Sequence, residues 1–229
     1  MTSDLFKVPF GSGEGGEMND GMSRARFIRI SSAGIAGAAL LAALGPAALA
    51  QTDSSLEAEF EEAAKQYGVP KEVLLAMGYV NTRWEMPPPD TTPYKEGDID
   101  GRGTYGIMQL VQNPFEDTLG AASTLTGISE EKLKTDRRSN ILGGAALLAE
   151  SQGKDKPSRL GDWSGAAGGR GGNGKEYRAV AGVGAGELYA EQTFEALKSG
   201  ASEQTKSGEK VSLPAKSLDA RVNAQGEVS

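Results

Sequence analysis

Most of the short motifs that could carry chemistry in this chain are incomplete. The run Gly169-Arg-Gly-Gly-Asn-Gly174-Lys175 has the spacing of a phosphate-binding loop, but Glu176 stands where such loops need Ser or Thr to hold magnesium. The acidic pair Asp98 and Asp100 suggests calcium, yet a calcium loop needs more oxygen ligands and a distal Glu. We therefore expect neither a cofactor nor a metal site.

The composition removes several classes of catalytic site. The chain has 229 residues and contains neither Cys nor His. These two absences exclude disulfides, Cys/His zinc sites, His general bases and Ser-His or Cys-His catalytic pairs. The 24 Lys and Arg against 31 Asp and Glu give a net charge of −7. This acidic balance, with no basic cluster, argues against nucleic-acid binding.

The first fifty residues have the pattern of an export signal. Three arginines between residues 24 and 29 precede an apolar stretch at 35–44, and an Ala-x-Ala sequence ends at Ala50. This order is typical of a cleaved signal peptide. An uncleaved membrane anchor stays open as an alternative, because residues 28–50 are nearly long enough to span a bilayer. We expect a secreted or cell-envelope protein that meets the membrane only through this segment.

Helical spacing dominates the chain that follows. A capping box at 54–57, with Ser54 as N-cap, predicts a helix that ends at Gly68. A second helix is predicted over 71–84, where three prolines stop it. A long loop rich in Pro and Gly then covers 87–104, and loops of this length in compact domains are often functional.

Shorter helices are predicted beyond the loop. Pro114 opens one with Phe115 facing inward, Ser129 caps a short charged helix, and Asn140 caps another. The adjacent glycines of this last helix, at 143 and 144, would weaken it unless another element packs closely there. A final helix is predicted over 187–197, and no alternating strand pattern is evident, so the fold class is mostly α.

The chain divides into three predicted segments. Residues 1–50 are the N-terminal extension and signal peptide, and residues 51–198 form the helical domain. Residues 199–229 contain no aromatic side chain and few large apolar ones, which predicts a linker or disordered tail.

One ordered set of motifs is more specific than these features. It comprises Tyr67-Gly68-Val69-Pro70, Arg83-Trp84, Tyr105-Gly106-Ile107-Met108-Gln109-Leu110 and Asn140-Ile141-Leu142-Gly143-Gly144. The set resembles the lysozyme-like soluble lytic transglycosylase domain, which cuts the glycan strands of peptidoglycan. It is most similar to the version at the N-terminus of secreted bacterial N-acetylmuramoyl-L-alanine amidases. The likeness covers about residues 56–198 and implies a lysozyme-like fold, peptidoglycan as partner and a downstream amidase domain.

The resemblance also identifies where the family keeps its catalytic acid. In that family a Glu, typically followed by Ser, lies late in the second helix and protonates the glycosidic oxygen. The matching position here is Asn81, followed by Thr82. A side-chain amide cannot act as a general acid, although it can hydrogen-bond a sugar. Glu85 is the candidate replacement, but one helical turn displaces a side chain by roughly 5–6 Å.

Further roles follow from the same resemblance. The family's Gly-x-Met-Gln motif brings backbone and amide groups close to sugars, and tryptophans can stack on sugar faces. Substrate-binding roles are thereby implied for Trp84, Tyr105, Gly106, Met108, Gln109 and Trp163. Trp84 also lies on the apolar stripe of its helix, so core packing is an equal alternative.

Two main functional interpretations remain open at this point. In the first, the chain is an exported transglycosylase or muramidase with displaced acid machinery. In the second, it is a non-catalytic module that binds glycan strands for an amidase or other hydrolase domain. A helical envelope domain that binds protein is a third, less specific option.

Overall fold

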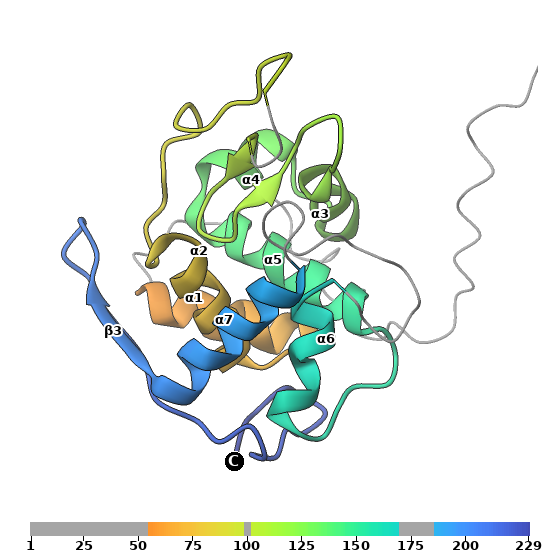
Figure 1. The fold of residues 1–229 in the computed structure, drawn as a ribbon, viewed down its shortest axis with the longest axis vertical. Helices are drawn as coiled ribbons and strands as arrows, with labels where there is room; N and C mark the ends of the chain where they lie inside the picture. The colour runs from red at the N-terminus through yellow and green to blue at the C-terminus, as the bar shows by residue number, and fades with distance from the viewer. Residues whose placement is uncertain (1–54, 99–101, 170–185) are drawn as a thin grey trace, which may run out of the picture. The chain divides into compact units, whose positions relative to one another are not determined.

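The computed structural model describes residues 55–98, 102–169 and 186–229, so the predicted export signal at 1–50 lies outside its description. All described residues belong to one compact unit, Leu49–Ser229. Helices dominate this unit and confirm the mostly α class (Figure 1). Among the described residues, no helix has the length and apolar character needed to cross a membrane.

The elements are short, and their connections range from one residue or none to a long loop between the second helix and the first strand. The helices of the described ranges are α1 (Leu56–Tyr67), α2 (Lys71–Thr82), α3 (Thr118–Thr126), α4 (Glu130–Thr135), α5 (Arg137–Gln152), the 3-10 helix η3 (Leu160–Trp163), α6 (Ser164–Ala167) and α7 (Gly186–Ser199). The strands form two antiparallel pairs, β1 (Thr104–Tyr105) with β2 (Leu110–Val111) and β3 (Ala201–Gln204) with β4 (Lys210–Leu213). Helix α2 packs against α7, and α5 packs against both α1 and α3.

The first helix follows the capping pattern of its sequence with a shift of one residue. Ser55, rather than Ser54, is the N-cap, and its hydroxyl accepts a hydrogen bond from the Ala58 N–H at 3.3 Å. The predicted stop at Gly68 is confirmed, because this residue adopts the left-handed conformation at φ 60°. The chain then turns at Pro70, the N-cap of α2.

The prediction that Pro114 opens a helix with Phe115 inside is wrong. Helix α3 begins four residues later, at Thr118, with Asp117 as its N-cap. The side chain of Asn113 accepts hydrogen bonds at 2.9 Å from the N–H groups of both Phe115 and Glu116, which forms a turn instead of a helix. Phe115 is consequently 55% exposed at this turn.

The prediction that Asn140 caps a helix is also wrong. Helix α5 begins at Arg137, and its N-cap is Asp136, whose carboxylate accepts from the Ser139 N–H at 2.9 Å. The carboxylate competes better for this position because a charged acceptor suits the positive end of a helix. Asn140 instead lies inside the helix and is completely buried.

Close packing against the glycines of α5 is confirmed. A Cβ atom on Gly143 would lie 3.1 Å from side-chain atoms of Leu110 and Leu133. A Cβ atom on Gly144 would lie 2.7 Å from the side chain of Met108. The two glycines therefore let β2 and the segment before it reach the centre of the core, which offsets the weak helix propensity of Gly.

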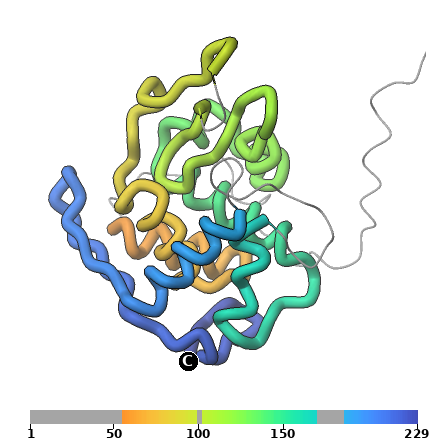
Figure 2. The backbone as a smooth tube through the Cα atoms, viewed as in Figure 1, coloured from red at the N-terminus to blue at the C-terminus, as the bar shows by residue number. Residues whose placement is uncertain are grey.

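The prediction that residues 199–229 form a linker or disordered tail is wrong. This segment contains the β3–β4 hairpin, whose Val211 and Leu213 join the hydrophobic core. These alternate apolar residues suffice because strand side chains alternate between faces, so one face of β4 is buried without any aromatic residue. The chain then returns to η3, where the N–H of Leu160 donates to Ala220 O at 2.9 Å (Figure 2).

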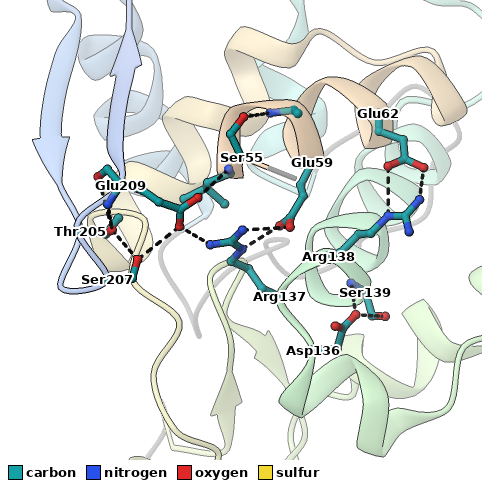
Figure 3. Close-up of polar contacts among 12 residues, drawn as sticks. Ser55, Glu59, Glu62, Asp136, Arg137, Arg138, Ser139, Thr205, Ser207 and Glu209 are labelled. Atoms are coloured by element: carbon teal, nitrogen blue, oxygen red, sulfur yellow. Dashed lines mark hydrogen bonds and ion pairs between the residues drawn. The ribbon is translucent and has the colours of Figure 1, made fainter. Parts of the chain in front are cut away.

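One charged cluster joins this hairpin to the helices (Figure 3). Arg137 at the start of α5 donates two hydrogen bonds to Glu59 of α1, at 2.7 and 2.9 Å. Its remaining terminal nitrogen contacts Glu209, just before β4. Glu209 also accepts from the N–H of Leu56 at 3.0 Å. The C-terminal segment therefore helps to cap the first helix, and belongs to the domain that was predicted to end at residue 198.

Candidate functional site

The candidate site begins where α2 ends. Asn81 lies in the last turn of the helix, and the next two turn residues, Arg83 and Trp84, both adopt left-handed conformations with φ of 56° and 62°. Their N–H groups donate to Tyr79 O at 2.9 Å and Gly78 O at 3.2 Å, which closes the helix. Such conformations cost non-glycine residues of order 1 kcal/mol each and concentrate at functional sites.

Trp84, the tryptophan of this turn, is buried in the core and hydrogen-bonds the backbone of α2. The Trp84 indole is almost fully buried, and its Nε1–H donates to Leu75 O at 2.8 Å. Its ring lies 4.9 Å from the ring of Tyr79, and the Arg83 guanidinium lies 4.0 Å from the Tyr79 centroid. Trp163 is completely buried as well. Both tryptophans therefore lie in the core, where neither ring presents a face to solvent.

Asn81 faces α7, where the side chains of Tyr189 and Thr193 lie near its amide. Its Nδ2 is buried, although the residue as a whole is only partly covered. Burial raises the pKa of Tyr189, while the nearby side chains of Thr193 and Asn81 act to lower it. Asn81 Nδ2, Tyr189 Oη and Thr193 Oγ1 all lack a hydrogen-bond partner within the described ranges. The three groups lie near one another but outside ordinary hydrogen-bond geometry, which is unusual for buried polar atoms because each imperfect contact carries a desolvation cost.

Glu85, the candidate replacement for the missing acid, and the acidic pair of the long loop differ in their contacts. Glu85 is partly buried, and its Oε1 accepts a hydrogen bond from the Lys206 N–H at 2.8 Å. Lys206 lies in the connection between β3 and β4, so the hairpin holds Glu85. Asp98 accepts from the N–H of Lys95 at 2.9 Å within its own loop. Asp100 lies outside the described residues, as does most of the phosphate-loop-like run at 169–175.

The 105–110 motif forms the turn between β1 and β2. Gly106 adopts φ 73°, and a Cβ atom there would lie 2.2 Å from the amide of Asn140. Gln109 adopts φ 51°, and its side-chain Nε2 donates to Gly106 O at 2.9 Å. Met108 is completely buried. Tyr105 and Gln109 are consequently the motif side chains that remain partly exposed to a ligand.

The buried side chain of Asn140 holds this turn in place. Sequence analysis did not identify Asn140 as a site residue. Its Oδ1 accepts from the N–H of Met108 at 2.8 Å, and its Nδ2 donates to Tyr105 O at 3.0 Å and to Leu133 O at 2.9 Å. One buried amide thus fixes both ends of the motif's turn and connects them to Leu133 of α4. The available signal was an Asn in the interior of a helix, which the wrong capping assignment concealed.

The two halves of the site meet at Gly78. A Cβ atom on Gly78 would lie 3.1 Å from both Ile107 Cγ2 and Trp84 Cδ1. The strained end of α2 and the strained turn at Gln109 therefore pack against one another. Arg83, Trp84 and Gln109 are the non-glycine residues with positive φ in the described part of the chain.

A second partly exposed row of side chains lies beside Tyr105. The ammonium group of Lys134 lies 4.6 Å from the centroid of the Tyr105 ring. The same Nζ donates to Gln112 Oε1 at 2.6 Å, and Gln112 Nε2 donates to Glu130 Oε2 at 2.7 Å. This row places a positive charge next to the exposed aromatic residue of the motif. Sequence reasoning missed Lys134, because nothing in the sequence of α4 distinguishes it from Lys132.

Neither a metal-binding cluster in the described residues nor a similar known protein adds to this description of the site. The described ranges hold no group of three or more His, Cys, Asp or Glu side chains that could bind a metal ion. Comparisons of the chain with protein-family models, curated proteins and solved structures found no match. The function is therefore argued from this geometry and from the motifs that the sequence carries.

Proposed function

We propose that this chain is an exported protein that binds the glycan strands of peptidoglycan and cuts them weakly or not at all. The observation that carries the proposal is the packing of two strained segments around Gly78. One is the end of α2, with Arg83 and Trp84, and the other is the turn at Gln109. Backbone strain that the surrounding fold maintains is typical of ligand-binding and catalytic sites.

The chemistry of the central position favours binding over cleavage. Asn81 carries an amide, which donates and accepts hydrogen bonds but has no proton to give at neutral pH. The two buried hydroxyls beside it, Tyr189 and Thr193, can each donate a hydrogen bond. Two buried hydroxyls that make no hydrogen bond of ordinary geometry are a suitable surrounding for a carboxylate. This arrangement supports the idea that Asn81 stands where an acid would be accommodated.

The enzymatic alternative depends on Glu85. This carboxylate is partly buried, but it lies beyond the end of α2 and after two left-handed residues, so helical spacing no longer sets its position relative to Asn81. Its hydrogen bond with the Lys206 N–H also turns it toward the hairpin. For Glu85 to act as an acid, the hairpin would have to release it or the sugar would have to bind next to the hairpin.

The experiment compares wild type with Asn81→Glu, Asn81→Gln and Glu85→Gln on insoluble peptidoglycan. We expect wild type to sediment with the wall and to release little or no 1,6-anhydro product. Asn81→Glu should release such product, whereas Asn81→Gln, which has the same length but no acidic proton, should not. Binding by wild type and by the three variants is measured in the same tubes.

Two results would contradict the proposal. Clear product release by wild type, lost in Glu85→Gln, would make the chain an enzyme with a displaced acid. Failure of wild type to sediment with peptidoglycan would reject the substrate class itself. The export signal is tested separately by sequencing the N-terminus of the secreted protein, which should begin at Gln51.

A further inference from the structure

In the row formed by Tyr105, Lys134, Gln112 and Glu130, the two charged side chains make no ion pair with each other within the described residues. Glu130 and Lys134 are four residues apart on α4, in the orientation that favours a direct ion pair along a helix. Instead, the Gln112 amide lies between them, with its oxygen toward Lys134 and its nitrogen toward Glu130. This arrangement separates the two charges and leaves the ammonium group over the Tyr105 ring.

The contacts of Lys134 contrast with those of the cations that support the fold. Lys65, Arg137 and Arg138 each contact a carboxylate. Lys134 makes no ion pair within the described ranges, and its partners are a neutral amide oxygen and an aromatic ring. An ammonium group has three donors, so Lys134 keeps hydrogen-bonding capacity for a ligand while its position is fixed by neutral groups.

The charge of the whole chain makes this isolated cation more significant. The net charge of −7 repels an anionic polymer at long range. Peptidoglycan is such a polymer, because each muramic acid bears a lactyl group that is either a carboxylate or the attachment point of a peptide with its own carboxylates. A protein of this charge needs local cations to hold that polymer, and Lys134 lies beside the partly exposed tyrosine of the motif.

We infer that Lys134 is a specificity residue that receives a carboxylate borne by muramic acid, while Tyr105 contacts the sugar beside it. The inference rests on the proposed function and deepens it. It implies that the site distinguishes wall glycan from uncharged glycans built of N-acetylglucosamine alone. The shared chemistry is a carboxylate on the lactyl side of the sugar, whether it belongs to the lactyl group or to the peptide.

The test measures binding of three soluble glycans by the full chain. They are peptide-bearing wall strands, strands stripped of peptide so that the lactyl carboxylate is free, and chitin oligosaccharides, which carry no carboxylate. The variants are Lys134→Met, Lys134→Arg and Lys132→Met. Lys132 is the matched control, because it is exposed on the same helix and its replacement removes the same charge.

We expect Lys134→Met to weaken binding of at least one carboxylate-bearing strand by about tenfold, as the loss of a charge-assisted hydrogen bond predicts. Chitin binding should be unchanged, Lys134→Arg should keep most of the affinity, and Lys132→Met should behave as wild type. A loss confined to peptide-bearing strands identifies a peptide carboxylate. A loss that includes the stripped strands identifies the lactyl group.

The contrary outcomes separate this inference from the proposed function. Equal losses for chitin and for wall strands in Lys134→Met would mean that the lysine only orders the tyrosine ring, and the carboxylate contact would be rejected. An unchanged affinity in Lys134→Met for all three glycans would reject it as well, with glycan binding intact. Absence of binding by wild type to any glycan would reject both. The melting temperature of each variant, compared with wild type, controls for loss of the hydrogen bond to Gln112.

Discussion

Two asparagines of the candidate site are held in opposite ways. Asn140 is completely buried under the 105–110 turn, and its side chain makes three hydrogen bonds with the backbone of Tyr105, Met108 and Leu133. Asn81 is only partly covered, yet its buried Nδ2 has no partner in the described ranges. The Asn140 amide therefore stabilises the fold. The Asn81 amide carries a desolvation cost that no hydrogen bond of its Nδ2 offsets.

The Arg137 cluster and the α2–α7 contact differ in the same way, because polar groups are paired in the first and poorly paired in the second. In the Arg137 cluster, each charged group contacts an opposite charge or a backbone donor (Figure 3). At the contact of α2 and α7, by comparison, Tyr189 and Thr193 have buried hydroxyls without partners. Polar groups that are present for stability are normally paired, so unpaired buried groups point to a different requirement. Trp163 Nε1 is another such atom in the described ranges, but the α2–α7 contact brings several of them together.

Replacing each asparagine by alanine tests the comparison most directly. Asn140→Ala removes three hydrogen bonds and leaves buried backbone groups unpaired, so we expect a loss of about 3 kcal/mol or more in the free energy of unfolding. Asn81→Ala should change it by less than about 1 kcal/mol, because no hydrogen bond of Nδ2 is lost. Urea denaturation of both variants measures the difference. Equal losses would mean that Asn81 is bonded in solution, and the contrast would disappear.

The Arg137 cluster allows a second matched pair. Arg137→Met leaves the carboxylate of Glu59, whose side chain is 8% exposed, without its main partner, and should cost about 3 kcal/mol. Arg138→Met, the neighbouring substitution, breaks a contact with Glu62, whose side chain is 45% exposed, and should cost less than about 1 kcal/mol. Thermal unfolding of the two variants gives the comparison. A small effect of Arg137→Met would show that the hairpin is held by its other contacts, which include apolar packing and the Leu56 N–H bond to Glu209.

The helices could be predicted from the sequence where local signals agree. The stop at Gly68 and the cap at Ser129 depend on the nearest few residues, and both predictions are confirmed. Phe115 and Asn140 were misassigned because a side chain a few residues away, at Asn113 or Asp136, takes the position of cap or turn former. Competing local hydrogen bonds decide such boundaries, and spacing of apolar residues does not reveal which one forms.

The C-terminal hairpin and the site depended on contacts between distant segments. Val211 and Leu213 are few and separated, so their burial is evident only once the helices they cover are placed. Similarly, the tyrosine beside Asn81 comes from α7, more than a hundred residues later. The motif resemblance located Asn81 and the 105–110 turn, whereas the side chains that surround them, Tyr189 and Lys134, required the fold.

The smallest expected effect concerns the hydroxyl of Tyr189. Tyr189→Phe removes a buried oxygen that has no hydrogen bond in the described ranges, so it should leave the free energy of unfolding unchanged or raise it by up to about 1 kcal/mol. Thr193→Val is the matched control on the same helix, with the same expectation. Loss of more than about 1 kcal/mol in either variant would show that the hydroxyl is bonded in solution, for example to a buried water.

The pH dependence of the same variant sharpens this result. Burial raises the pKa of Tyr189 above its ordinary value of 10, although Thr193 and Asn81 act to lower it. A raised pKa in the folded state means that the folded chain keeps a proton that the unfolded chain releases above pH 10. Its contribution to stability is therefore complete below pH 10 and is lost as the pH rises. Wild type should lose stability above pH 10 more steeply than Tyr189→Phe, and parallel curves would mean that solvent reaches the phenol and that the α2–α7 contact is open.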